Sequence, residues 1–369
     1  MKIGFVGGGS GGHFYPLIAV AEVLSAYPAK PDLYYFGPSP YNEEELAKHS
    51  IKHVSCPAGK LRRYFSLQNF IDLFRTFFGF FIALWKLYVI YPDVIFSKGG
   101  YTSVPILIAA RLLRIPIVIH ESDAVPGRAN KLAMKFARYI GIAYDDVAQF
   151  FPPEKTALVG IPLRQSVRTI NQDPFTTLGI PNDKPLIYIT GGSLGADRLN
   201  DVALEILDEL LPNYRIFHQT GSVHYDKLSQ TANALLAGNP YRENYYIQGS
   251  ISGEMISNLY DAALIVVTRA GSTTLFEIAA HSRPAIIVPI PEKISHDQRT
   301  NAYAYAGNGA AVVIEEKNLT QHLLIDEIIS IIGDQERWQT MAAAANRQSM
   351  PEAAEKVANI LHQIGKEHE

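Results

Sequence analysis

The sequence predicts an α/β protein built from two doubly wound parallel sheets, and three observations support this fold class. Short apolar runs of strand length alternate with helical patterns along the chain, which is typical of parallel sheets covered by helices on both faces. A strand followed by a glycine-rich turn and a helix occurs at the start of the chain and again after residue 185. The chain has 369 residues, and single cores stop growing at roughly 250–300 residues. We therefore expect two domains.

Composition narrows the class of protein. The formal net charge is −3, so the chain lacks the basic character of a nucleic-acid-binding protein and we expect no nucleic-acid partner. Its only cysteine is Cys56, which excludes an intramolecular disulfide and indicates a reducing cytoplasm. A lone cysteine is more often a small core residue than a nucleophile. A glycine turn interrupts the first apolar run, so we expect no signal peptide.

The first predicted unit is the strand Ile3–Val6, the turn Gly7–Gly12 and a helix whose apolar pattern begins near Pro16. Glycine permits a sharp bend or the close approach of a ligand, and the helix start offers unpaired N–H groups. One alternative is an ordinary strand-to-helix turn. A second is a dinucleotide fingerprint, which needs an acid at the end of the next strand. That strand, Leu33–Phe36, is followed by Gly37 and Pro38, which disfavours a nicotinamide cofactor.

Polar residues follow later strands of this half, where ligands of parallel sheets bind. The remaining strands are expected at Val94–Phe96, Ile117–Ile119 and Tyr139–Ala143, with a strand end near Val159. A glycine turn, Ser97–Pro105, follows the first of these. The pair His120 and Glu121 follows the second and suits acid–base work or polyol binding. The alternative for each such residue is a helix cap or a turn former.

Residues Lys60–Tyr91 are unusually rich in phenylalanine. The longest uncharged stretch, Thr76–Trp85, is shorter than the ~20 apolar residues that span a bilayer. Composition leaves two interpretations open: a helix buried on most sides, or an interfacial helix with aromatic side chains in the acyl boundary and basic residues at the headgroups.

The second half repeats the pattern of the first. A linker rich in Pro, Asp and Asn extends to Lys184, and a second strand–turn–helix unit begins at Leu186, with its helix from about Asp197. Further strands are expected at Arg215–His218, Tyr245–Gln248, Ala263–Thr268 and Ala285–Pro289, and an amphipathic helix at Pro351–Ile364. Small residues at Ser272–Thr274 open a helix that carries Glu277. This arrangement suits a nucleotide, with phosphates on the amides and ribose hydroxyls on the carboxylate.

Taken together, these motifs resemble the MurG family of bacterial glycosyltransferases. The matching motifs lie in family order and cover nearly the whole chain: Gly8-Gly9-Ser10-Gly11-Gly12-His13, Gly99-Gly100-Tyr101, His120-Glu121, Asn130-Lys131, Pro162-x-Arg164, Gly191-Gly192-Ser193-x-Gly195-Ala196, His218-Gln219-x-Gly221, Arg269-x-Gly271, Glu277-Ile278-Ala279 and Gln298-x-x-Asn301-Ala302. The chain departs from the usual pattern at Ser10, Ser122, Asp123 and Ile161. Asp123 replaces an amide by a charge that would repel an anionic diphosphate acceptor.

The resemblance implies a GT-B fold, with two Rossmann-like domains facing a central cleft. The N-terminal domain, 1–163, would face the acceptor and the membrane, and a C-terminal helix of about 346–369 would pack back onto it. The domain 164–345 would bind the UDP-sugar. Transfer of N-acetylglucosamine from UDP-N-acetylglucosamine to lipid I, the undecaprenyl-pyrophosphoryl-MurNAc-pentapeptide, would yield lipid II for peptidoglycan synthesis.

The resemblance also implies roles for single residues. Ser193 and the Ser272–Thr274 turn, continuing into Leu275 and Phe276, would hold the donor pyrophosphate. Glu277 would bind the ribose, Asp297 and Gln298 the sugar hydroxyls, and Arg164 would lie near the uracil. The remaining donor contacts would come from Ser10, Gly11, Gly12 and Asn130, whereas Tyr101 and Asp123 would lie on the acceptor side.

The expected chemistry is an inverting displacement at the anomeric carbon, in which a base deprotonates the acceptor hydroxyl. His13 is the first candidate for that base and Glu121 the second. No metal site or cofactor is expected, because helix N-termini can stabilise the leaving UDP. With a lipid acceptor, the interfacial interpretation of Lys60–Tyr91 is favoured, at the cytoplasmic face of the plasma membrane. Two alternatives stay open: a GT-B transferase with another lipid or small-molecule acceptor, and a non-catalytic sugar-nucleotide binder.

Overall fold

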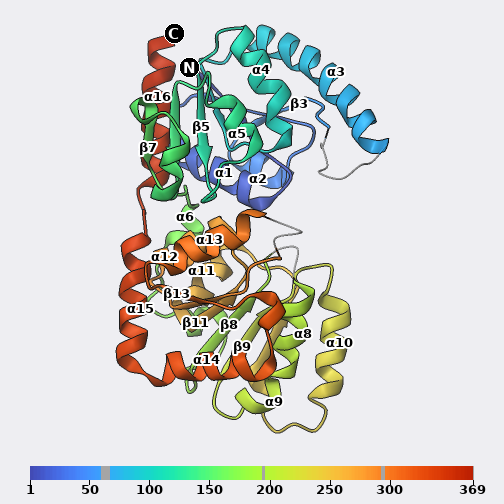
Figure 1. The fold of residues 1–369 in the computed structure, drawn as a ribbon, viewed down its shortest axis with the longest axis vertical. Coiled ribbons are helices and arrows are strands. Elements are labelled where there is room, and N and C mark those ends of the chain that lie inside the picture. Colours follow the sequence, from blue (N-terminus) through green and yellow to red (C-terminus); the bar gives the residue numbers. More distant parts are fainter. Residues whose placement is uncertain (60–66, 193–195, 292–295, 369) are drawn as a thin grey trace. The chain divides into compact units, whose positions relative to one another are not determined.

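The computed structural model describes residues 1–59, 67–192, 196–291 and 296–368. The chain divides into two compact units (Figure 1). The first comprises Met1–Gln165 together with Met350–Glu369, and the second comprises Ser166–Ser349. Each unit has its own parallel sheet and its own hydrophobic clusters. The predicted α/β class with two parallel sheets is confirmed.

The first unit contains a seven-stranded parallel sheet of order β3-β2-β1-β4-β5-β6-β7. Its strands are β1 (Lys2–Val6), β2 (Asp32–Gly37), β3 (Lys52–Ser55), β4 (Val94–Ser97), β5 (Ile117–Glu121), β6 (Tyr139–Ile142) and β7 (Thr156–Leu158). Val6 pairs with Phe36 on one side and with Ser97 on the other. The carboxyl ends of β2, β1 and β4 therefore lie side by side, and so do the turns that follow them.

Helices cover this sheet on both faces. They are α1 (Gly11–Ser25), α2 (Glu43–Lys48), α3 (Leu67–Ile90), α4 (Val104–Leu112), α5 (Arg128–Ala133) and α16 (Ala353–His368), with 3₁₀ turns at Tyr101–Ser103, Asp145–Phe150 and Pro153–Lys155. The last helix packs against α1, β1 and β4. Its Val357, Ala358 and Leu361 join the same hydrophobic cluster as Ile3 and Phe5. The first unit is thus completed by residues from the far end of the sequence.

The second unit contains a six-stranded parallel sheet of order β10-β9-β8-β11-β12-β13. Its strands are β8 (Leu186–Thr190), β9 (Arg215–Gln219), β10 (Tyr245–Gln248), β11 (Ala263–Thr268), β12 (Ala285–Ile287) and β13 (Ala311–Val313). Its helices are α7 (Pro174–Leu178), α8 (Asp197–Glu205), α9 (Leu207–Leu210), α10 (Tyr225–Leu235), α11 (Gly253–Ala262), α12 (Ser272–Ala280), α13 (His296–Ala306), α14 (Gln321–Gly333) and α15 (Gln335–Gln348), with 3₁₀ turns at Arg242–Asn244 and Glu316–Asn318. Helix α6 (Gln165–Arg168) begins at the boundary between the units.

Two strands were not predicted, β3 and β13, and both lie at the edge of a sheet. Edge strands are short and incompletely buried, so their pattern is weaker than that of a central strand. Strand β13 is apolar but only three residues long. Strand β3 reads Lys-His-Val-Ser and has no buried residue. The lone cysteine, by contrast, behaves as predicted: Cys56 is fully buried, and burial raises the pKa of its thiol to about 11.

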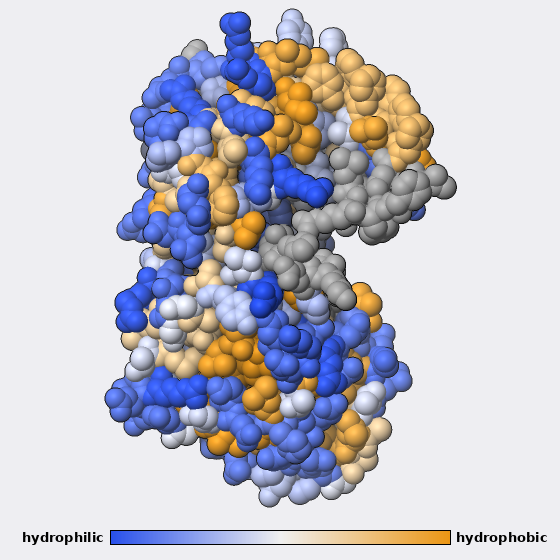
Figure 2. All heavy atoms as spheres, in the orientation of Figure 1, coloured by the Kyte–Doolittle hydropathy of each residue, from blue (hydrophilic) through white to orange (hydrophobic). Residues whose placement is uncertain are grey.

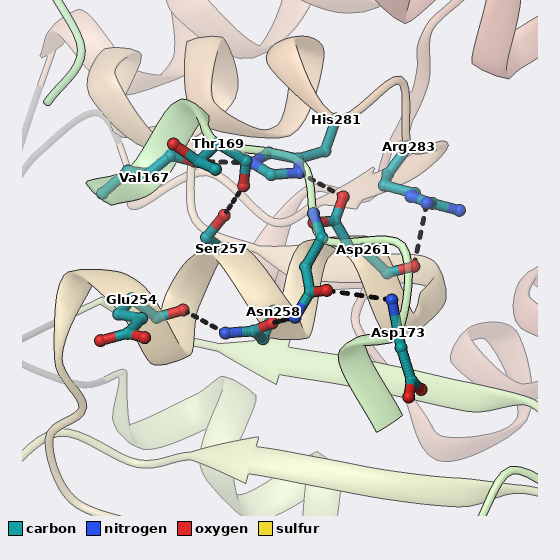
Figure 3. A network of polar contacts seen from close by, with 10 residues as sticks. Val167, Thr169, Asp173, Glu254, Ser257, Asn258, Asp261, His281 and Arg283 are labelled. Atoms are coloured by element: carbon teal, nitrogen blue, oxygen red, sulfur yellow. Dashed lines mark hydrogen bonds and ion pairs between the residues drawn. The ribbon is translucent and has the colours of Figure 1, made fainter. Parts of the chain in front are cut away.

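A buried polar network fastens residues 167–171 to the second unit (Figure 3). His281 places Nε2 2.7 Å from the carbonyl oxygen of Val167 and Nδ1 2.7 Å from Oδ1 of Asp261. The backbone N–H of Asn171 donates to the other oxygen of Asp261 at 2.7 Å, and Ser257 donates to the carbonyl of Thr169 at 2.6 Å. The start of the second unit is therefore held by specific hydrogen bonds.

Candidate active site

The glycine turn after β1 is held against the second strand. The hydroxyl of Tyr35 donates to the carbonyl oxygen of Gly7 at 2.7 Å. A Cβ atom at position 8 would lie 2.7 Å from that hydroxyl, so only glycine fits there. At the start of α1, Ser10 Oγ lies 3.1 Å from His13 Nδ1. The turn thus places His13 at the carboxyl end of the sheet with Nδ1 already engaged.

The glycine turn after β4 approaches the same place. Gly99 and Gly100 have φ values of 78° and 83°, which side chains rarely adopt. A Cβ at position 100 would lie 3.5 Å from the His13 ring, and one at position 99 would lie 2.9 Å from Oδ1 of Asn130. The Tyr101 ring lies beside Gly9, 3.5 Å from a Cβ built there. Three predicted site residues, His13, Tyr101 and Asn130, are therefore gathered around two glycine turns.

Glu121 ends β5 and is almost completely enclosed. Its carboxylate accepts hydrogen bonds from the backbone N–H of Asp123 at 3.1 Å, the backbone N–H of Gly127 at 2.8 Å and the side-chain amide of Asn130 at 2.9 Å. Burial nevertheless raises the pKa of Glu121 to about 7, and the charge of Asp123 adds to that rise. Asn130, predicted to reach a sugar, is itself buried and orients Glu121. Its contact with a sugar stays a prediction.

His13 is partly buried and shows the opposite shift. Burial lowers the pKa of its imidazole below 6.5, the nearby charge of Asp123 acts against this shift, and Lys98 reinforces it. A lowered pKa keeps the ring neutral at pH 7, as a general base requires. Asp123 acts electrostatically on both His13 and Glu121, so this aspartate and both candidate bases form one electrostatic group.

Lys98 belongs to this group but was assigned no role from the sequence. It directly follows β4, is 3% exposed and places Nζ 2.5 Å from His120 Nδ1. The ring of His120 places Nε2 2.6 Å from the carbonyl oxygen of Gly160. The sequence did contain a signal for a role of Lys98, because this lysine lies between a buried strand and a glycine turn. Such positions lie at the carboxyl end of a parallel sheet, where ligands bind.

The second unit carries the predicted nucleotide residues at the start of α12. Gly271 is its N-cap and has no side chain to occupy the first amides. Ser272 is buried, whereas Thr273 and Thr274 are partly exposed. Leu275 and Phe276 have their side chains in the core. The backbone N–H of Leu275 also donates to the carbonyl oxygen of Gly271 at 3.1 Å, so the predicted ligand contacts of these two residues stay predictions.

Glu277 lies one and a half turns into α12. The hydroxyl of Tyr260 donates to its carboxylate at 3.1 Å. Burial and the charge of Glu277 hold the pKa of Tyr260 well above 10, so this hydroxyl keeps its proton. Nearby at the end of β11, Arg269 pairs with Glu316 at 2.5 Å and donates to the carbonyl of Val288 at 3.1 Å. Tyr260 and Arg269 are supporting residues whose roles the sequence analysis did not identify.

The remaining predicted donor residues come from both units. Ser193 lies outside the described residues, and Asp297 is on α13 without a described side chain. Gln298 accepts a hydrogen bond from the backbone N–H of Ile290 at 3.4 Å. Arg164 belongs to the first unit, as do Ser10, Gly11 and Gly12, and its guanidinium lies 3.8 Å from the centre of the Tyr15 ring. The roles of these residues stay predictions.

A broad apolar surface runs along α3. Only one side of the helix is buried, through Ala83 and Leu87. Its exposed large side chains are Phe70, Ile71, Leu73, Phe74, Phe77, Phe78, Phe81, Ile82, Trp85, Tyr88 and Val89. We call these eleven residues the α3 apolar face, and Figure 2 shows apolar side chains gathered over this helix. The interpretation of a helix buried on most sides is therefore wrong.

Between Phe70 and Ile90 this helix is long and apolar enough, by length and composition alone, to cross a membrane. Only 17% of its most apolar stretch is buried inside the protein. Burial in a core does not account for this composition. Among the described residues, no group of three or more His, Cys, Asp or Glu side chains is arranged to hold a metal ion.

Comparison with known proteins covers both units. Residues 3–142 match the N-terminal domain of glycosyltransferase family 28, and residues 186–368 match the C-terminal domain of the same family. The two matches include the turns after β1 and β4, Glu121 and the start of α12.

Individual relatives align from end to end. The chain is 34% identical over 366 residues to a UDP-N-acetylglucosamine–N-acetylmuramyl-(pentapeptide) pyrophosphoryl-undecaprenol N-acetylglucosamine transferase of Bacillus thuringiensis subsp. konkukian, which covers 98% of this chain and 99% of the relative. It is 35% identical over 365 residues to the enzyme of the same name from Shouchella clausii, with the same coverage. The crystal structure of MurG from Acinetobacter baumannii has a TM-score of 0.75 and 26% identity, and covers 98% of this chain and 100% of that chain.

Proposed function

We infer the reaction of this chain from its family, because the chain belongs to glycosyltransferase family 28. It is a UDP-sugar-dependent hexosyltransferase with the GT-B fold. It moves N-acetylglucosamine from UDP-N-acetylglucosamine to the lipid-linked acceptor N-acetylmuramyl-(pentapeptide) pyrophosphoryl-undecaprenol, lipid I, and so forms lipid II for peptidoglycan synthesis. The observation that carries this inference is end-to-end similarity to transferases of that activity.

We place the donor on the second unit. The backbone N–H groups at the start of α12 suit the pyrophosphate, because a helix N-terminus presents N–H groups and a partial positive charge. Glu277, oriented by the Tyr260 hydroxyl, is positioned as an acceptor for the ribose hydroxyls. Ser193, Asp297 and Gln298 complete the proposed donor set on the basis of the family resemblance.

We place the acceptor on the first unit, at the carboxyl ends of β1, β4 and β5. His13 takes the proton of the acceptor hydroxyl there, because its pKa is lowered and the ring is neutral at pH 7. Ser10 engages Nδ1, which leaves Nε2 for the acceptor. Tyr101 and Asp123 flank that position. Glu121 is the second candidate for the base, although its carboxylate already accepts three hydrogen bonds.

The proposed reaction is a direct displacement with inversion. The acceptor oxygen forms a bond to the anomeric carbon while the bond from that carbon to the UDP oxygen breaks. The acceptor proton passes to His13, and the electron pair leaves with UDP. The amides of α12 stabilise the charge that develops on the diphosphate, so the leaving group needs no protonation.

We also propose that the enzyme binds the membrane surface through the α3 apolar face. A lipid-linked acceptor brings its reactive sugar only to the headgroup region. A helix with exposed aromatic side chains on one side and basic residues beside them suits that region. Arg75 and Lys86 lie on this helix, and Arg62 and Arg63 precede it in the sequence, outside the described residues. The peripheral location at the cytoplasmic face of the plasma membrane belongs to this proposal.

The test of the function is a transfer assay with defined substrates. Purified protein is given UDP-N-acetylglucosamine and a lipid I analogue in vesicles, and both the disaccharide product and released UDP are measured. The expected result is one UDP per product, with much less product from UDP-glucose. UDP release without disaccharide, or transfer only to a different acceptor, would contradict the assignment.

A further inference from the structure

Lys98 is a buried cation at the carboxyl end of the first sheet, where we place the acceptor. Its backbone N–H donates to the carbonyl of Val6 at 2.8 Å, which fixes it beside the first glycine turn. A Cβ atom on Gly7 would lie 3.0 Å from the Lys98 Cβ. The side chain is 3% exposed. A lysine ammonium is rarely placed in such surroundings unless an interaction repays the loss of water.

The direct contacts of the ammonium are with neutral groups. Nζ lies 2.5 Å from Nδ1 of His120 and donates to the hydroxyl of Ser122. Nε2 of His120 faces the carbonyl of Gly160 and therefore carries the ring proton, which leaves Nδ1 to accept from Lys98. Burial, and after it Lys98, lower the pKa of His120 well below 6.5, which agrees with a neutral ring. These contacts provide hydrogen-bond acceptors for the Lys98 ammonium, but they carry no negative charge that would neutralise it.

The charge is balanced through space by two carboxylates. Glu121 and Asp123 both act to raise the pKa of Lys98, against a larger effect of burial that lowers it to about 7. Two further titratable groups among the described residues interact with Lys98, His13 on α1 and His120 on β5. Both imidazoles are neutral at pH 7, because burial lowers both pKa values. Without Lys98, an acceptor diphosphate would therefore meet two carboxylates and no cation from this cluster.

We propose that Lys98 is a charge-balancing positioning residue of the acceptor site, whose buried ammonium offsets Asp123 and Glu121 so that an acceptor carrying a pyrophosphate can bind. This inference rests on the proposed function, because it takes the acceptor to be anionic and bound at the first sheet. Lys98 acts through the electrostatic field and through His120, and touches no reacting atom. It also accounts for an aspartate at position 123 in the site of an anionic substrate.

The test compares the variants K98M, D123N and K98M/D123N in the transfer assay with the lipid I analogue. Methionine removes the charge and keeps an unbranched side chain that is one atom shorter than that of lysine. K98M is expected to raise the acceptor KM by roughly 10- to 100-fold, as for a lost interaction with a charged group. D123N is expected to lower the acceptor KM. The double variant is expected to return to within about twofold of the wild-type acceptor KM, because it removes one positive and one negative charge and leaves the net charge of the cluster unchanged.

The pH dependence supplies a second readout. The wild-type acceptor KM should rise as pH increases through about 7, because Lys98 loses its proton there and Glu121 loses its own over the same range. In K98M only the Glu121 contribution remains, so the rise should be smaller. A structural role for Lys98 would leave the shape of this profile unchanged.

The matched control is K155M. The ammonium of Lys155 also lies in the first unit and donates to the backbone carbonyls of Met134 and Ala137, at 2.7 and 3.1 Å. Its removal should lower stability and leave the acceptor KM unchanged. Thermal unfolding followed by circular dichroism checks that the first unit of each variant is folded, and calorimetric binding of UDP-N-acetylglucosamine checks that the donor site on the other unit is unaffected.

Three results would overturn the inference: an unchanged acceptor KM in K98M, a double variant as impaired as K98M, or an equal shift in K155M. Failure of the wild-type protein to transfer to the lipid I analogue would instead contradict the proposed function. The two failures are therefore distinguishable in a single set of assays.

Discussion

His13 and Glu121 can both serve as a base, but burial moves their pKa values in opposite directions. That of His13 falls below 6.5 and that of Glu121 rises to about 7. A base must be deprotonated to work, so activity is lost as pH falls through its pKa. If His13 is the base, kcat/KM should hold until the pH is below 6.5. H13A should then lower turnover by about 10²–10⁴-fold.

The control for this prediction is donor affinity, which should stay near wild type in H13A because the UDP-sugar is placed on the second unit. Kinetics across the acid range in both proteins provides the measurement. A rate that already falls near pH 7, together with an active H13A, would point to Glu121.

Glu277 tests the donor site in the same way. E277A should weaken UDP-N-acetylglucosamine binding by ~1.5–3 kcal/mol, because the ribose hydroxyls would lose a charged acceptor. Titration calorimetry measures this directly. E209A is the matched control, because Glu209 is an exposed glutamate on α9 of the same unit. Equal affinity in E277A and the wild type would remove Glu277 from the site.

Among the elements, α3 carries the membrane proposal. Replacing Phe77, Phe78 and Phe81 by serine should release the protein from anionic vesicles, because these side chains are 56%, 60% and 50% exposed and pack little against the core. Their removal should spare turnover on a short-chain soluble acceptor. Wild-type binding should weaken with salt, since each basic residue near anionic lipid contributes ~1 kcal/mol.

Vesicle sedimentation compares this triple variant with a second triple in the other unit, in which exposed Ile170, Val223 and Leu235 are replaced by serine. The second triple should bind vesicles like the wild type. Equal loss of binding in both, or retention in both, would show that α3 has no special part in docking.

The central elements of the fold could be predicted from the sequence because buried parallel strands are continuous apolar runs. The strands β1, β8 and β11 are buried along almost their whole length, and their apolar runs predict them directly. Strand β13 has only partly buried residues, and its pairing depends on β12, which no local pattern records.

The candidate site was predictable where residue type and strand ends coincide, as at His13 and Glu121. It was not predictable where a role depends on contacts between distant segments. Lys98 meets His120, which is 22 residues away, and Tyr260 meets Glu277 from a different helix. Local sequence shows neither contact. The burial of Asn130 behind Glu121 likewise depends on how α5 packs beside β5.

For the molecule as a whole, the His281 network defines where the second unit begins (Figure 3). H281A should lower the free energy of unfolding of that unit by ~1–3 kcal/mol, because it leaves one carboxylate oxygen of buried Asp261 and the carbonyl oxygen of Val167 without the hydrogen bonds of the imidazole. Thermal unfolding provides the measurement. H322A is the control, because His322 is exposed on α14 and should change stability by less than ~0.5 kcal/mol. A loss in H281A no larger than in H322A would contradict this account.

The position of α16 has a consequence for biosynthesis. This helix supplies Val357, Ala358 and Leu361 to the core of the first unit, yet the ribosome makes it after all 184 residues of Ser166–Ser349. The second unit is contiguous and can fold as it emerges from the exit tunnel. The first unit must wait with part of its core uncovered, and the aromatic side of α3 is exposed throughout that delay. During this interval, chaperones or the lipid surface can bind the first unit, which is translated first but completes its folding last.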